Sequence, residues 1–118
     1  MARDKDVVVW VCGARKYYDF AKMCAVLGTM HHEVGISVVM HGGGWGAERL
    51  ASKWARANDV VEVAVMANFK RHGRRAEIMR DKTAISLNPD MVLIFPGADH
   101  SGMVRKATEA GVAVINIT

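Results

Sequence analysis

Several features that mark common protein classes are scarce or absent in this sequence. Its 118 residues include only two cysteines, Cys12 and Cys24, and two prolines. At most one disulfide could form, and a chain of this size can build a core without it, so we expect a reducing, cytoplasmic environment. No apolar run approaches the roughly 20 residues of a membrane-spanning helix, and the charged start lacks the pattern of a secretory signal. We therefore expect no membrane partner.

Familiar motifs of catalysis and metal binding are also missing. The chain has no G-x-x-x-x-G-K-[ST] loop, no G-x-S-x-G turn and no C-x-x-C pair. His31 and His32 are adjacent and would point in different directions from a helix, so we expect no metal site. The stretch Gly42-x-Gly44-x-x-Ala47 matches the loose dinucleotide-binding pattern, but no acidic residue closes the following strand. We therefore expect no standard NAD site and no cofactor.

What the sequence does contain is typical of one folded domain. Hydrophobic residues make up 51% of the chain and charged residues 24%, a balance that supports a buried core. The length fits a single domain over residues 1–118, without a linker or an internal repeat. The net charge of +4 allows phosphate-bearing partners without identifying one. The densest basic segment, Lys70 to Arg75, is either a solvated turn before a helix or a phosphate contact.

Five short apolar runs rich in valine and isoleucine predict strands. They show little alternation between apolar and polar residues, which favours a mainly parallel sheet covered on both faces. Helical patterns separate the runs, so the sequence predicts an α/β, Rossmann-like, three-layer domain with strand order 3-2-1-4-5. The predicted strands are Val7–Val11, Ile36–His41, Val60–Met66, Met91–Phe95 and Val112–Ile117.

Four amphipathic patterns predict the helices. The first begins after Asp19, a good N-cap residue, and ends at Gly35. The other three begin at about Gly46, run from Arg74 to Leu87, and run from a Ser101 cap to Gly111. The positions expected to face the core are Phe20, Met23, Leu27, Met30 and Val34, then Ala47, Leu50, Ala51, Trp54 and Ala55, and finally Met103, Ala107 and Ala110.

Three of the predicted strands end in segments rich in glycine and small residues. In an open α/β sheet, ligands bind beyond the carboxyl ends of the strands, where the strand order reverses. The predicted order makes strands 2, 1 and 4 neighbours, so we expect their three loops to converge on one crevice. The candidate binding residues are Gly13, Ala14 and Arg15 after the first strand, Gly42, Gly43, Gly44, Trp45, Gly46 and Glu48 after the second, and Pro96, Gly97, Ala98, Asp99, His100 and Ser101 after the fourth.

Glycine-rich turns that lead into a helix suit an anionic ligand. Without side chains the backbone can approach the ligand, and the helix begins with unpaired N–H groups at the positive end of its dipole. Arg15 and Arg80 can donate charge-assisted hydrogen bonds to a phosphate. Glu48 would repel a phosphate, so it either holds a ribose hydroxyl or ties the N–H groups of its own loop. His100 is either a general acid or base or a solvated side chain.

The motifs around these loops resemble those of the YspA-like, YpsA-related branch of the SLOG superfamily. That branch typically reads T-G-x-R-x-Y/W after strand one, H-G-G-A-x-G-A-D after strand two, and F-P-G-G-x-G-T followed by M-V after strand four. The counterparts here occur in the same order, as do counterparts of two further stretches of the branch. They are Cys12 to Tyr17, His41 to Glu48, Phe95 to Ser101 with Met103-Val104, Phe69 to Gly73, and Arg80-Asp81.

The resemblance implies a Rossmann-like domain that binds, senses or sequesters a nucleotide or nucleotide-derived phosphorylated ligand. Superfamily relatives include the lonely-guy nucleotide phosphoribohydrolases and the DNA-processing protein DprA, so two alternatives stay open. One is cleavage of the N-glycosidic bond of a nucleoside monophosphate, and the other is binding of single-stranded DNA. The phosphoribohydrolase glutamate has no counterpart after Ser101, so Asp99 or Glu48 would have to replace it, and no catalytic residue is assigned. Related proteins are commonly oligomeric, so we also expect a homo-oligomer.

Overall fold

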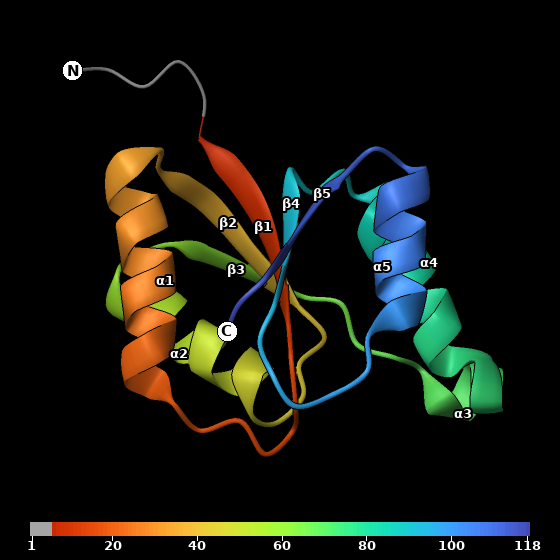
Figure 1. Cartoon of the computed structure of the whole chain (residues 1–118). Helices are drawn as coiled ribbons and strands as arrows, with labels where there is room; N and C mark the ends of the chain where they lie inside the picture. Colours follow the sequence, from red (N-terminus) through yellow and green to blue (C-terminus); the bar gives the residue numbers. More distant parts are fainter. Residues whose placement is uncertain (1–5) are drawn as a thin grey trace.

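In the computed structural model, which describes residues 6–118, strands and helices alternate around one five-stranded sheet (Figure 1). The strands lie in the order β3-β2-β1-β4-β5, and each neighbouring pair is parallel. The predicted strand order and direction are therefore confirmed. The strands are β1 (Val7–Cys12), β2 (Ile36–His41), β3 (Val61–Ala64), β4 (Met91–Ile94) and β5 (Ala113–Asn116).

Helices cover both faces of the sheet, which confirms the predicted three layers. Figure 1 shows α1 (Phe20–Glu33) and α2 (Ala47–Ala57) on one face, and α4 (Ala76–Ser86) and α5 (Ser101–Glu109) on the other. The short helix α3 (Phe69–His72) and the 3-10 turn η1 (Gly73–Arg75) precede α4. Within residues 6–118, every helix is too short or too polar to span a bilayer.

Each face of the sheet has its own apolar cluster, because successive residues of a strand point to opposite faces. Val9 and Val11 of β1 pack under α1 and α2, whereas Trp10 and Cys12 pack under α4 and α5. Burial of one such apolar side chain contributes about 1.5–3 kcal/mol. The helix residues that close these clusters are Met23, Leu27, Ala51, Trp54 and Ala55 on the first face, and Ala84, Met103 and Ala107 on the second.

The two edge strands are less covered than the three central strands. Val61 of β3 is 61% exposed and Ile115 of β5 is 40% exposed. Both strands are also shorter than predicted, since β3 ends at Ala64 and β5 begins at Ala113. An apolar run does not distinguish a central strand from an edge strand, which has a ladder partner on one side only.

Local hydrogen bonds set where the helices begin and end. Oδ1 of Asp19 accepts the N–H of Lys22 at 2.9 Å, as expected for an N-cap. Ser101 is not the cap of α5: it is the first helical residue, and its N–H donates to Oδ1 of Asp99 at 2.9 Å. Val34 and Ala110 were predicted to face the core, but both are exposed. Both residues follow the last turn of their helix, where the helical period no longer determines the direction of a side chain.

The basic segment from Lys70 to Arg75 is largely exposed and leads into a helix, as one of its two interpretations expected, but it is itself helical instead of a simple turn. Oδ1 of Asn68 accepts the N–H of Arg71 at 3.0 Å and thereby caps α3. Gly73 ends α3 with a φ of 55°. The third predicted helix therefore begins at Ala76, two residues later than expected, and is preceded by a separate helical turn.

Candidate functional site

The three loops that follow β1, β2 and β4 lie in direct contact around Ala14. The carbonyl of Ala14 accepts the N–H of Ala47 at 3.2 Å, and a side-chain carbon added at Gly46 would lie 2.2 Å from the same oxygen. A carbon added at Gly97 would lie 2.9 Å from Cβ of Ala14. The backbone of Gly46, with φ at 72°, also adopts a conformation that other residues avoid. The loops meet because the residues at their contacts have almost no side chain.

A cavity of about 380 Å³, which we call the crevice, opens at this edge of the sheet. Its volume lies within the range of roughly 300–1,000 Å³ that is usual for small-molecule sites. The crevice brings together more than half of the predicted binding residues. These are Gly13, Arg15, Gly42, Gly43, Gly44, Trp45, Glu48, Arg80 and His100.

The other predicted residues lie outside the crevice, mainly because the β4 loop turns away after Gly97 packs against Ala14. The N–H and hydroxyl of Ser101 lower the pKa of Asp99, whose carboxylate is directed to its own loop. His100 is thus the one member of this loop segment that lines the crevice. One hollow, beside Tyr17, is lined by Ala14, Pro96 and Gly97. Another, beside Arg105, is lined by Ala98, Asp99 and Ser101. Gly46 packs on the β1 loop.

Four residues of the crevice were not predicted: Met66, Ala67, Phe69 and Glu77. They belong to the connection after β3, to α3 and to the first turn of α4. The binding residues were expected only at the ends of strands 1, 2 and 4. Because β3 is parallel to β2, the carboxyl end of β3 lies at the same edge of the sheet. The predicted parallel arrangement could therefore have identified the segment after β3 as part of the site.

Two charged side chains of the crevice, those of Glu48 and Arg80, are held by contacts within the protein. Oε1 of Glu48 accepts the N–H of Gly44 at 2.8 Å, so this carboxylate ties its own loop. Nε of Arg80 donates to Oδ1 of Asp81 at 2.8 Å. A side-chain carbon at Gly42 would lie 2.3 Å from Nη1 of Arg80, which shows that the missing side chain leaves room for the guanidinium.

Some N–H groups of the β2 loop are used within the protein, and others are not. The N–H of Gly43 donates to Nδ1 of His41 at 3.0 Å, and that of Ala47 donates to the β1 loop. Gly46 has no side chain to cap α2. Within residues 6–118, no group accepts from the N–H of Glu48 or Arg49 in the first turn of that helix. These two donors lie at the positive end of the helix dipole.

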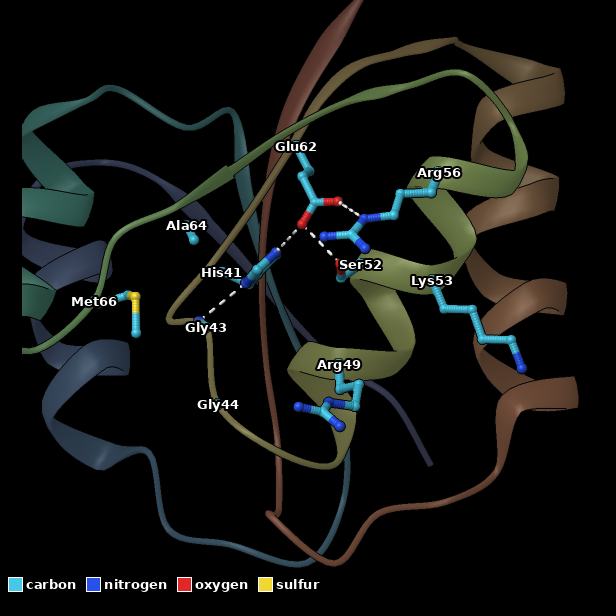
Figure 2. A pocket seen from close by; sticks show the side chains of 10 residues that line it. All are labelled: His41, Gly43, Gly44, Arg49, Ser52, Lys53, Arg56, Glu62, Ala64 and Met66. Atoms are coloured by element: carbon cyan, nitrogen blue, oxygen red, sulfur yellow. Dashed lines mark hydrogen bonds and ion pairs between the residues drawn. The ribbon is translucent and has the colours of Figure 1, made fainter.

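The loop after β2, residues 42–46, is called the glycine loop below. A chain of hydrogen bonds connects it to α2 and β3 (Figure 2). Oε1 of Glu62 accepts the Ser52 hydroxyl at 2.7 Å and lies 3.0 Å from Nε2 of His41, and Nε of Arg56 donates to Oε2 at 2.8 Å. Because Nδ1 of His41 accepts from Gly43, Nε2 carries the ring proton and donates to Glu62. Burial acts to raise the pKa of Glu62, but the hydrogen bonds outweigh it and lower that pKa to about 2.

These side chains and the nearby thiol are poorly suited to nucleophilic catalysis. Ser52, His41 and Glu62 are the residue types of a hydrolase triad, but the hydroxyl bonds to the carboxylate instead of the imidazole. Both ring nitrogens of His41 are already engaged, so the group orients the glycine loop. Burial, Glu48 and Asp81 raise the pKa of Cys12 to about 12, which keeps its thiol protonated.

Comparison with known proteins identifies relatives of this chain. It is similar to the Gene 61 protein of Mycobacterium phage D29, with 29% identity over 119 residues, which cover 92% of this chain and 94% of that protein. The sequence model of the YAcAr family, described as the YspA, cpYpsA-related SLOG family, matches residues 7–72, which include the loops after β1 and β2. The match extends over more than half of the sequence and agrees with the motif resemblance, so the chain belongs to the YspA, cpYpsA-related SLOG family.

Proposed function

We propose that this protein binds a nucleotide or nucleotide-derived phosphorylated ligand in the crevice. Membership of the SLOG family is consistent with binding or processing of a nucleotide-related ligand. The main support is a cavity of about 380 Å³ that is lined by the glycine-rich loops after β1 and β2, which are in contact, and to which the β4 loop contributes His100. These loops lie at the carboxyl edge of a parallel sheet, where α/β folds bind their ligands.

The crevice offers different surfaces to the different parts of a nucleotide. Arg15 and Arg80 supply charged donors for a phosphate, and the first turn of α2 adds backbone N–H groups. Trp45, Met66 and Phe69 are 56%, 69% and 59% exposed, and together they give the crevice an apolar rim. Exposed aromatic rings of this kind stack on nucleobases.

Isothermal titration with AMP, GMP, CMP and UMP tests the proposal, and we expect micromolar or tighter binding of at least one of them. Arg15→Ala and Arg80→Ala should each weaken binding about tenfold, because each removes a charge-assisted hydrogen bond. Lys82→Ala is the matched control, since it removes the same charge from an exposed position of α4 outside the crevice. Absence of binding for all four monophosphates and for the corresponding diphosphates contradicts the proposal.

A second candidate function is hydrolysis of the N-glycosidic bond of a nucleoside monophosphate. The observation that favours it is that two carboxylates, Glu48 and Glu77, line the crevice, although Asp99 does not. Chromatography of the titration samples decides between the two functions. Free base that forms with the native protein and disappears with Glu48→Gln or Glu77→Gln indicates an enzyme. A lack of free base at stoichiometric protein indicates binding alone.

A further inference from the structure

A second and larger cavity, of about 520 Å³, adjoins the crevice across the glycine loop (Figure 2). Gly43, Gly44 and Met66 line both cavities, so the loop forms the wall between them. We call the second space the α2 cavity, because most of its polar lining comes from that helix. Its other lining residues are His41, Arg49, Ser52, Lys53, Arg56, Glu62 and Ala64.

The two cavities differ in their balance of charge. In the crevice, two arginines are accompanied by two glutamates. In the α2 cavity, Arg49, Lys53 and Arg56 are accompanied by one carboxylate, that of Glu62. Arg56 already pairs with Glu62 at 2.8 Å, which leaves the charges of the other two cations unbalanced. Negative charge beyond a first phosphate is therefore accommodated better in the α2 cavity than in the crevice.

Arg49 is the cation best placed to receive an anion in this cavity. Its guanidinium carbon lies 3.7 Å from the centre of the Trp45 ring, a stacking contact that restricts the side chain. Within residues 6–118 it has no acidic partner. Figure 2 shows its guanidinium extending from α2 toward the side on which Gly44 lies. Lys53 instead lies over Phe20, with Nζ 4.4 Å from the ring centre, and so belongs to the rim beside α1.

We propose that the α2 cavity holds a second anionic group of the same ligand, so that the ligand straddles the glycine loop at Gly43 and Gly44. The ligand is then a nucleoside diphosphate, or a nucleotide whose diphosphate carries a further group, instead of a monophosphate. This inference rests on the proposed function. It adds the class of ligand and assigns Arg49 as the side chain that binds the second phosphate.

The test compares AMP with ADP and GMP with GDP by isothermal titration. For the native protein we expect a diphosphate to bind about tenfold more tightly than its monophosphate, because the second phosphate accepts one additional charge-assisted hydrogen bond. Arg49→Ala should remove most of this difference, because it weakens diphosphate binding more than monophosphate binding. Arg49→Lys keeps the charge and should restore part of the difference. Lys82→Ala, which removes a charge outside both cavities, should preserve it.

The outcomes separate this inference from the proposed function. Equal affinity for the mono- and diphosphates of both bases overturns the inference and leaves the proposed function standing. An Arg49→Ala variant that weakens mono- and diphosphate binding to the same extent also overturns it. If no nucleotide binds, both proposals are wrong. Arg49 is exposed, so its variants should fold, and circular dichroism verifies that they do.

Discussion

Gly46→Ala should destabilise this protein much more than the same substitution at Gly73. The two glycines have nearly the same backbone conformation, with φ 72° and ψ −127° at Gly46, and φ 55° and ψ −129° at Gly73. Alanine in such a conformation costs about 1–3 kcal/mol at either position. Their surroundings differ: nothing lies within 4 Å of a carbon added at Gly73, whereas one added at Gly46 would lie 2.2 Å from the Ala14 oxygen.

The size of the difference follows from what the added carbon meets at Gly46. The obstructing atoms are the backbone oxygen of Ala14 and the backbone carbon of Arg15, at 2.2 and 2.5 Å, so no side-chain rotation relieves the contact. The loops would have to separate by about 1 Å to reach normal van der Waals distances. That movement breaks the hydrogen bond from Ala47 to Ala14 and adds the cost of overpacking. We expect losses of about 3–5 kcal/mol at Gly46 and about 1–3 kcal/mol at Gly73.

Urea denaturation of the native protein and the variants measures these losses, and Gly28→Ala serves as the control. Gly28 lies inside α1 with nothing within 4 Å of an added carbon, so alanine should stabilise the protein there by about 0.5–1 kcal/mol. Equal losses at Gly46 and Gly73 would mean that the β1 and β2 loops are not in contact. That result would refute the convergence of loops on which the crevice depends.

Two further predictions concern ionisable groups near the glycine loop. The pKa of Glu62 is lowered from 4.5 to about 2, so the stability that its ionised form adds is present above pH 4.5 and is lost as the pH falls toward 2. Glu62→Gln should lack this part of the acid dependence in urea denaturation between about pH 2 and 5, and identical profiles for the two proteins would argue against the network. The pKa of Cys12 is raised to about 12 by burial, Glu48 and Asp81, so iodoacetamide at about pH 8 should modify Cys24 and spare Cys12 in the folded protein. Peptide mass spectrometry reads the result, and equal modification of both thiols would contradict it.

The fold was predictable because its signals are local and repeated. Apolar runs such as Val7–Cys12 and Met91–Ile94 are central strands, and the amphipathic segment after Asp19 is α1. One error occurs where two local signals compete. Asp99 and Ser101 are both good cap residues, and only the structure shows that the carboxylate of Asp99 accepts the N–H of Ser101.

The candidate site was predictable only in part, because its geometry depends on contacts between distant residues. The direction of the β4 loop is set where Gly97 packs against Ala14, and no local pattern encodes that contact. The link from Glu62 through His41 to Gly43 joins β3 to the end of β2 in the same way. A strand-end rule identifies which loops share an edge, but it does not identify which side chains support them.

The carbonyl oxygen of Ala14 lies against Gly46 and its methyl group lies against Gly97, and neither glycine carries a side chain. A side chain at position 46 would meet backbone atoms of the β1 loop and force the turns apart. A protein built in this way cannot adapt to a different ligand by altering its innermost turns. Under the proposed function, selectivity would be adjusted at Trp45, Met66 and Phe69, whose side chains are exposed.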